Sequence, residues 1–229
     1  NRICLYTVTS PEKDKLKVLK DLLLSLGDKS SIVFLNYRDS VERTALFLKE
    51  EGFIISWFHG GLEQREREAA LYRFSNGSAP ILVSTDLASR GLDIPDVDNI
   101  IHYHFPETED SYVHRVGRTA RWDKEGRTFF ILGPEERLPE FVSNEHEEYK
   151  IPDSLQKPAH PRMATIYIGK GKKDKISKMD IVGFLCKKGG LKSSEIGKID
   201  IKERFTYVAV VRTKIKEIIS LTKGEKIKG

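Results

Sequence analysis

Short apolar runs alternate with segments of helical periodicity along the chain from about Arg2 to Leu132. The runs are rich in β-branched and aromatic residues, which indicates strands, and the segments between them repeat apolar positions every three or four residues, which indicates helices. Such alternation predicts βαβ units around a parallel sheet. Ser40 is the expected N-cap of the second helix. The expected strands span residues 31–35, 54–58, 81–84, 99–103 and 127–132, and the expected helices span 11–26, 40–51, 62–75 and 110–119.

A polar, proline-bearing stretch over residues 143–161 interrupts this pattern and predicts an interdomain linker. Beyond it a shorter β-α-β-β-α cycle is expected, one strand short of a ferredoxin-like or RRM fold. The chain stops where the last strand should begin, so that strand is expected to be truncated. The predicted organisation is therefore an α/β parallel-sheet domain over 1–142, a linker over 143–161, and a small α+β, RRM-like (ferredoxin-like) domain over 162–229. The elements expected in the second domain are strands at 165–169, 196–201 and 205–211 and helices at 178–188 and 213–222.

The composition agrees with a soluble globular protein of two unequal domains. The chain has 229 residues, of which 39% are apolar and 32% charged, and domains usually hold about 100 to 200 residues. No apolar run approaches the roughly 18 residues that a bilayer requires, and the first residues do not form a signal peptide. We therefore expect a cytoplasmic protein with no membrane partner. Cys4 and Cys186 lie far apart without a C-x-x-C partner, so no metal site or disulfide framework is expected.

The net charge of +5 conceals an asymmetry between the two predicted domains. From Arg162 onward there are 18 Lys or Arg against 7 Asp or Glu, whereas the preceding residues hold 21 and 27. A basic tail on an acidic body suggests that the tail binds a polyanion. The alternative is a solvated lysine-rich surface without a ligand.

The segment from His114 to Arg121, His-Arg-Val-Gly-Arg-Thr-Ala-Arg, carries the strongest chemical signal. Arg118 and Arg121 are three residues apart and would project in nearly the same direction from a helical turn. Two neighbouring guanidinium groups suit a phosphate whose charge redistributes during transfer, which is the role of an arginine finger. The alternative is a pair of surface arginines that bind nearby carboxylates.

Two further segments begin directly after expected strands, where ligands bind in open α/β sheets. In the first, residues 84–95, Gly91 allows a close backbone approach, Thr85 offers a hydroxyl to a phosphate, and Asp93 could accept a hydrogen bond from a ribose hydroxyl. The second, residues 59–67, opens a helix, and helix N-termini bind anions. An ordinary helix start with solvated charges is the alternative there.

These three segments, in this order and spacing, resemble the motifs of the C-terminal RecA-like domain of DEAD-box RNA helicases over roughly residues 1–133. Residues 31–38 are similar to motif IV, 59–67 to the Q-x-x-R region, 84–94 to motif V and 114–121 to motif VI. The resemblance implies that Arg118 and Arg121 are arginine fingers, that Asp93 meets the nucleotide ribose, and that His114 helps to couple ATP to RNA. Ala120 departs from most of the family, which carries glycine there. The RNA path implied by the resemblance is lined by Asn36, Gln64, Arg67, Thr85 and Arg90.

The ATP-binding motifs of such an enzyme are otherwise absent from this sequence. It has no G-x-x-x-x-G-K-[ST] phosphate loop and no D-E-A-D sequence. By the resemblance, those parts and the Mg²⁺ ion belong to a preceding N-terminal RecA-like domain. We therefore expect this chain to bind ATP poorly and not to hydrolyse it by itself.

The basic tail carries candidate RNA-binding residues of two kinds. Exposed lysines could neutralise phosphates, and aromatic rings on the sheet could stack on bases. The lysines are Lys170, Lys172, Lys173 and Lys175, and the rings are Tyr167, Phe205 and Tyr207, of which at least one could instead be part of the core. Residues 191–201 with 206–209 resemble the C-terminal domain of one bacterial subgroup of the family, the DbpA type. That resemblance implies large-subunit ribosomal RNA as the partner, a hairpin as the target and ribosome assembly as the role. Two alternatives remain, an RNA-binding module whose RecA-like part is only a scaffold, and a DNA-directed relative.

Overall fold

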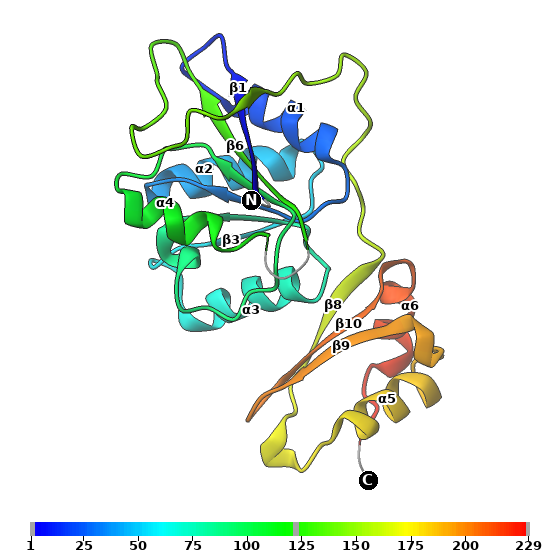
Figure 1. Ribbon diagram of the computed structural model, residues 1–229. Coiled ribbons are helices and arrows are strands. Elements are labelled where there is room, and N and C mark those ends of the chain that lie inside the picture. Colours follow the sequence, from blue (N-terminus) through cyan, green and yellow to red (C-terminus); the bar gives the residue numbers. More distant parts are fainter. Residues whose placement is uncertain (1–2, 121–123, 228–229) are drawn as a thin grey trace. The chain divides into compact units, whose positions relative to one another are not determined.

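The computed structural model of the chain describes residues 3–120 and 124–227. The described residues form two compact units, one that ends at His160 and one that starts at Pro161, with the short segment Tyr72–Ala79 grouped with the second. Each unit has its own sheet and its own apolar core. The two units therefore have separate folds, and Figure 1 shows the elements of each.

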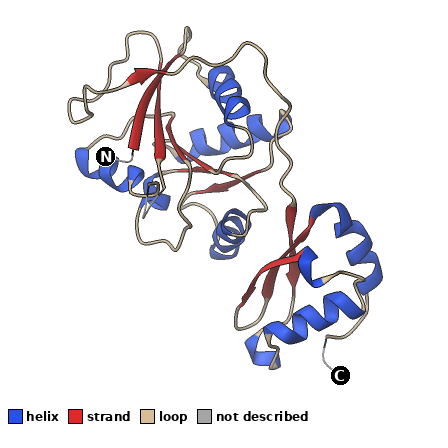
Figure 2. Cartoon of the chain, turned by 45° about the vertical axis from the view of Figure 1, so that its right-hand side comes forward, coloured by secondary structure: helices blue, strands red, loops and turns tan. Residues whose placement is uncertain are grey.

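The first unit is built on a sheet with the strand order β3-β4-β2-β5-β6-β1-β7. Every pair of neighbouring strands is parallel, which confirms the predicted α/β fold class. The central strands are buried along their whole length because helices cover both faces of the sheet (Figure 2). The strands are β1 Ile3–Thr9, β2 Ser31–Phe34, β3 Ile55–Phe58, β4 Ile81–Ser84, β5 Asn99–His102, β6 Gly126–Leu132 and β7 Glu147–Glu148.

Strands β1 and β7 were not expected from the sequence. The short β7 consists of two exposed glutamates that pair with Tyr6 and Thr7, so no apolar alternation marks it. Tyr149, the next residue, packs its ring edge-on against Phe129 at a centroid distance of 5.2 Å. The segment predicted as a linker, 143–161, thus adds a strand and a core contact to the first unit.

Helices α1 Leu16–Leu26, α2 Arg38–Glu50, α3 Gln64–Ser75 and α4 Glu109–Val116 connect the parallel strands. The five leucines at one face of α1 are all buried against the sheet, as the periodicity predicts. The expected N-cap at Ser40 is wrong, because α2 begins two residues earlier and Tyr37 is the capping residue. Tyr37 makes no side-chain cap hydrogen bond, so no polar cap residue marks this start.

The second unit has the predicted β-α-β-β-α order. Its antiparallel sheet has the order β8-β10-β9, and both helices pack on one face through Ile181, Leu185, Val208 and Ile218. Ser177 and Asp180 form a capping box at the start of α5. The elements are β8 Met163–Ile168, α5 Lys178–Lys187, β9 Ile196–Ile201, β10 Thr206–Val211 and α6 Ile215–Thr222.

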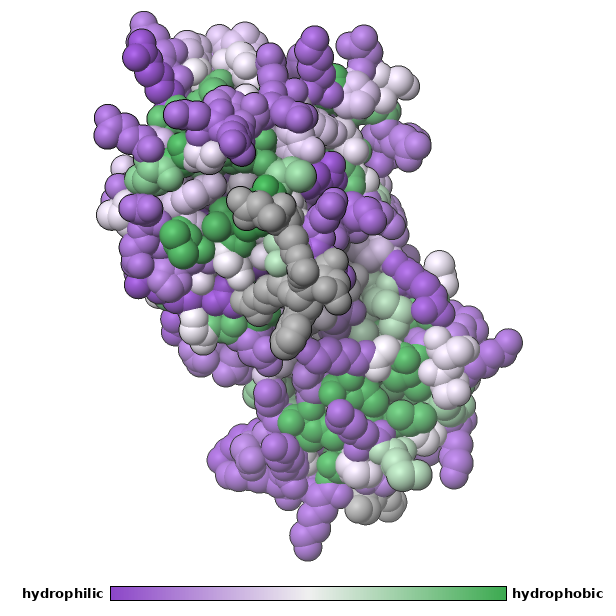
Figure 3. Space-filling model, viewed as in Figure 1, coloured by the Kyte–Doolittle hydropathy of each residue, from purple (hydrophilic) through white to green (hydrophobic). Residues whose placement is uncertain are grey.

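The surfaces of the two units differ in polarity on the face shown in Figure 3. Polar residues cover most of the visible first unit, whereas a group of apolar residues is visible on the second. None of the helices in the described part of the chain is long and apolar enough to span a bilayer.

Candidate nucleotide and RNA site

The candidate residues of the first unit lie just beyond the carboxyl ends of four neighbouring strands. Asn36 follows β2, the segment that leads into α3 follows β3, Thr85 follows β4, and His104 follows β5. These strands are adjacent in the order β3-β4-β2-β5, so the loops after them meet at one edge of the sheet. This is the edge at which open α/β sheets bind ligands.

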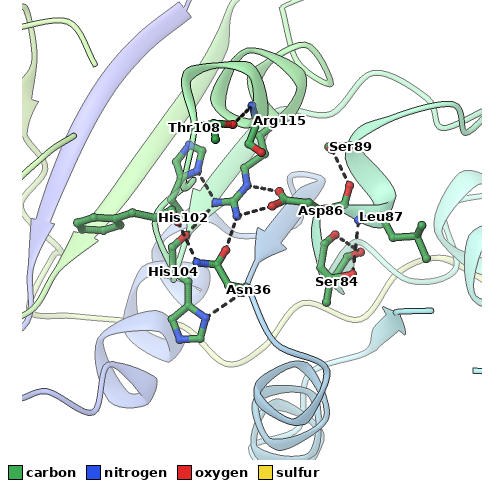
Figure 4. A network of polar contacts seen from close by, with 12 residues as sticks. Asn36, Ser84, Asp86, Leu87, Ser89, His102, His104, Thr108 and Arg115 are labelled. Atoms are coloured by element: carbon green, nitrogen blue, oxygen red, sulfur yellow. Dashed lines mark hydrogen bonds and ion pairs between the residues drawn. The ribbon is translucent and has the colours of Figure 1, made fainter. Parts of the chain in front are cut away.

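A fully buried arginine, Arg115 on α4, joins three of these loops (Figure 4). Its Nε donates to Asp86 Oδ1 at 2.5 Å and its Nη2 to Asn36 Oδ1 at 2.8 Å. Its Nη1 donates to the backbone oxygen of His104 at 2.8 Å and lies 3.3 Å from His102 Nδ1. A guanidinium group has five N–H donors in one plane. Burial of its charge would be costly without partners, and the acceptors around Arg115 offset that cost. We call this set of contacts the Arg115 junction.

The surroundings of the two histidines of the Arg115 junction favour the neutral imidazole. Burial, and then the charge of Arg115, lowers the pKa of His102 well below its usual value. Burial, followed by the charges of Lys15 and Arg115, also lowers the pKa of His104. A neutral imidazole leaves His104 Nδ1 able to accept the backbone N–H of Asn36, at 2.9 Å. The bond from Asn36 to His104 and the contact of Arg115 with His102 therefore require an unprotonated Nδ1 on each ring.

Arg118 lies against the loop that carries two of the predicted nucleotide-binding residues. Its side chain is only 6% exposed, and it donates from Nε to Ser89 O at 3.1 Å and from Nη1 to Leu92 O at 2.8 Å. Leu92 stands between Gly91, which has a φ of +63°, and the exposed Asp93. The structure thus brings Arg118, Gly91 and Asp93 into one neighbourhood. Arg121 lies outside the described residues.

Ala120 adopts a left-handed backbone conformation, with a φ of +56°. Residues with a Cβ atom are disfavoured there and glycine is not. This gives a physical reason for the glycine that the resembling family carries at this position. The alanine therefore introduces strain next to the predicted fingers.

The predicted RNA-path residues differ in how they are held. Arg90 and His114 both contact Asp110, and the His114 Nε2 to Asp110 Oδ1 distance is 3.4 Å. Gln64 is exposed at the first turn of α3, where its Nε2 donates to Glu68 at 3.0 Å. Arg67 has a buried Nε without a hydrogen-bond partner among the described residues.

Thr85 and Asn36, the other two residues of the predicted RNA path, have partners within the loops. Thr85 Oγ1 accepts the N–H of Leu87 at 3.4 Å and so caps a short 3-10 turn. Both ends of the Asn36 amide make a hydrogen bond, because its Oδ1 accepts from Arg115 and its Nδ2 donates to Phe105 O at 3.0 Å. Asn36 therefore shapes this edge of the sheet through internal contacts.

The second unit places its candidate rings at one end of its sheet and its candidate lysines in the loop that follows β8. Tyr167 and Tyr207 are cross-strand partners with centroids 5.6 Å apart, and Phe205 lies 5.3 Å from Tyr207. Tyr167 is 45% exposed, whereas Tyr207 is 5% exposed. Of these rings, Tyr167 is thus the most accessible. The predicted lysines at 170, 172, 173 and 175 are all exposed in the loop after β8.

Sequence reasoning missed the residues that hold the site together. Arg115 lies inside the segment that was singled out, and Asp86 stands next to Thr85, but nothing in the sequence shows that they bind each other. Asp110, which contacts both Arg90 and His114, was also missed. One signal could have identified Arg115. The segment 114–121 contains a third arginine in addition to the two that were assigned to the phosphate, and that arginine had no predicted role.

Comparisons with known proteins agree with this geometry. Residues 14–123 match the model of the helicase conserved C-terminal domain, so the first unit is a helicase C-terminal domain. A solved structure of the Escherichia coli DEAD-box protein SrmB, bound to regulator of ribonuclease activity A, superposes with a TM-score of 0.60 at 28% identity and covers 70% of this chain and 99% of that one. Saccharomyces cerevisiae Dbp5 bound to RNA and ADP BeF3 superposes with a TM-score of 0.54 at 30% identity, covering 58% of this chain and 35% of Dbp5.

The second unit shows to which subgroup of helicases the chain belongs. Residues 165–229 match the DbpA RNA binding domain, and the two family matches together cover well over half of the chain. The chain is 34% identical over 223 residues to the ATP-dependent RNA helicase DbpA of Escherichia coli K12, covering 95% of this chain. It therefore belongs to the DEAD-box RNA helicases of the DbpA type. It spans about half of its curated relatives, 49% of that protein and 51% of DbpA from Bacillus subtilis, to which it is 28% identical.

Proposed function

We propose that this chain is the C-terminal part of an ATP-dependent helicase that unwinds short RNA duplexes. The observation that carries the proposal is the Arg115 junction, in which one buried side chain fixes the loop of Asn36, the loop of Thr85 and Asp86, and helix α4. Helix α4 also bears His114 and leads to Arg118. A change on the nucleotide side would therefore be transmitted to the RNA side through a fixed network.

On the nucleotide side, Arg118 and Arg121 would stabilise charge on the transferred phosphate, and Asp93 would accept from the ribose. Gly91 would allow the backbone to approach the nucleotide. Arg118 would have to exchange the carbonyl oxygens of Ser89 and Leu92 for phosphate oxygens, a stronger charge-assisted pairing. The similar protein Dbp5 has been solved with RNA and ADP BeF3, which supports a nucleotide and RNA in such a fold.

On the RNA side, Gln64, Arg67, Thr85 and Arg90 would contact the phosphate backbone, with Asn36 acting through the position of its loop. Contacts of this kind fix register without reading bases. His114 would respond to both ligands, because it shares Asp110 with Arg90. The RNA path and the nucleotide site would thus meet at α4.

Hydrolysis would require a second motor domain. The phosphate loop and the D-E-A-D sequence are absent from this sequence, and acidic residues of such a motif hold Mg²⁺ in phosphoryl-transfer enzymes. We propose that an N-terminal RecA-like domain of the same protein supplies both, and that this chain alone is inactive. Closure of the two domains over ATP would complete the site.

The second unit would anchor the enzyme on its RNA. The loop after β8, which we call the lysine loop, carries the exposed lysines at 170, 172, 173 and 175 and would bind phosphates. Tyr167 would stack on a base. We propose a hairpin of large-subunit ribosomal RNA as the target, ribosome assembly in the cytoplasm as the setting, and residues 162–229 as the anchoring domain.

The test joins this chain to the N-terminal motor domain of Escherichia coli DbpA and measures RNA-stimulated ATP hydrolysis. We expect Arg118→Ala to lower kcat by about 10³-fold or more, the size of an arginine-finger effect. Arg137→Ala is the matched control, because Arg137 is an exposed arginine of the same unit and should leave kcat unchanged. If Arg118→Ala retains full hydrolysis and duplex unwinding, the first unit is only a scaffold for an RNA-binding module. Competition by single-stranded DNA equal to that by RNA would instead favour a DNA-directed enzyme.

A further inference from the structure

We propose that the turn between β9 and β10 is part of the RNA-binding surface of the second unit, where it forms one rigid phosphate-binding ridge with the lysine loop. This inference rests on the proposed RNA-anchoring function. It specifies the part of the RNA that the second unit would bind, which is the phosphate backbone of a folded stem. We call this surface the basic ridge. It consists of Lys170, Lys172, Lys173 and Lys175 from the loop and Arg204 from the turn.

Two backbone hydrogen bonds clamp the loop to the turn. Lys172 donates its N–H to Lys202 O at 2.8 Å, and Lys173 donates its N–H to Glu203 O at 2.9 Å. These bonds run between segments about thirty residues apart in the sequence and lie outside the regular pairing of β9 with β10. The lysine loop is therefore held at a fixed distance from Arg204.

Gly171 makes this clamp possible. A Cβ atom at this position would lie 2.1 Å from Lys202 O, 2.7 Å from Phe205 N and 2.8 Å from Arg204 N. All three are backbone atoms, so no side-chain rotation could relieve the overlap. Glycine is required here because the backbone of the loop and the backbone of the turn approach each other too closely for a residue with a Cβ atom.

The loop is also closed on itself. Asp174 Oδ2 accepts the N–H of Gly171 at 3.0 Å, and Asp174 returns its own N–H to Gly171 O at 2.9 Å. Thr206 Oγ1 donates to Lys170 O at 2.8 Å, which fixes the start of the loop to β10. A loop with this many internal bonds loses little further backbone entropy when it binds a ligand.

The charge of the ridge points to phosphate. The basic ridge has five exposed cationic side chains, and the same loop and turn contain two acidic residues, Asp174 and Glu203. The Lys170 Nζ atom lies 3.8 Å from Asp174 Oδ1. A net excess of positive charge on a rigid, exposed surface matches the regularly spaced phosphates of an RNA stem. A flexible single strand would gain less from the fixed spacing.

The experiment measures binding of the full chain to a fluorescein-labelled RNA stem-loop by anisotropy over a series of salt concentrations. Neutralising one phosphate contact should lower affinity about fivefold at 0.15 M salt and reduce the salt slope by about one. We expect this result for Arg204→Gln, as for Lys172→Gln. Lys216→Gln is the charge-matched control, because Lys216 is an exposed lysine on α6, which adds no residue to the basic ridge.

Gly171→Ala tests the clamp without changing any charge. It should weaken binding at least as much as Arg204→Gln, and the double variant should bind no more weakly than Gly171→Ala alone, because the clamp is what places Arg204. Circular dichroism would show whether Gly171→Ala still folds, and Arg204→Gln provides the test if it does not.

The outcomes separate the two proposals. If Lys172→Gln weakens binding but Arg204→Gln behaves like Lys216→Gln, the turn is not part of the site, and the ridge is overturned while RNA anchoring by the loop stands. If Lys172→Gln also binds like the unmodified chain, the proposed role of the lysine loop itself fails. A single strand bound as tightly as the stem-loop would contradict recognition of a fixed phosphate spacing.

Discussion

Removal of the Arg115 guanidinium should destabilise the first unit severely. Arg115→Met keeps much of the side-chain volume but leaves Asp86, Asn36 Oδ1 and His104 O without their shared donor. Asp86 is 39% exposed, so water can partly replace its lost partner. A buried acceptor left without its donor costs about 1 to 3 kcal/mol, and Asn36 Oδ1 and His104 O both lose theirs, so the total should reach several kcal/mol. Since the free energy of unfolding of a domain is about 5 to 15 kcal/mol, most of the stability could be lost.

Urea unfolding followed by tryptophan fluorescence would measure this loss. Both tryptophans of the chain precede residue 160, so the signal reports on the first unit. Arg43→Met is the matched control, because Arg43 also pairs with one aspartate, Asp14, at 2.7 Å, but both side chains are more than half exposed. Exposed pairs contribute about 1 kcal/mol or less.

The two variants should therefore differ by several kcal/mol although each removes one arginine from one carboxylate. An Arg115→Met variant that loses no more stability than Arg43→Met would refute the view that the junction holds the loops together. Arg115→Lys should fall between them, because an ammonium group keeps the charge but cannot reproduce the planar set of donors.

Two further results are expected. Ala120→Gly should raise the free energy of unfolding by about 1 kcal/mol, because it relieves the left-handed strain of a residue with a Cβ atom; a decrease in urea-unfolding experiments would contradict this account. Stability should also fall as the pH drops below about 6.5, because the pKa values of His102 and His104 are lowered in the folded state and the unfolded chain then binds protons that the native state does not. His104→Asn should reduce this dependence, and an unchanged pH profile would be evidence against it.

The order of elements could be predicted from the sequence because their cores follow simple periodicity. The leucine face of α1 and the largely apolar, fully buried strands β2 and β4 illustrate this, since burial on one face or on both leaves a direct trace in the residues. Strand β7 leaves none, because two exposed glutamates pair only through their backbone atoms. The start of α2 was also misplaced, since Tyr37 caps it without a side-chain hydrogen bond.

The candidate site was predictable in its residues but not in its contacts. The segment from His114 to Arg121 indicated phosphate chemistry, yet the buried role of Arg115 depends on β2, β4 and β5 being neighbours, which only the strand order establishes. The clamp at Gly171 likewise joins segments whose proximity has no local signature. Contacts between distant segments are properties of the fold rather than of a motif.

The contacts of Arg118 bear on how freely this part of the sequence can vary among relatives. Its two described acceptors are the carbonyl oxygens of Ser89 and Leu92, and every amino acid carries such an oxygen. Substitutions at these two positions should therefore leave the hydrogen bonds of Arg118 intact as long as the backbone keeps its path. Insertion or deletion of one residue between them would displace an acceptor, so selection here should act on loop length more strongly than on residue identity.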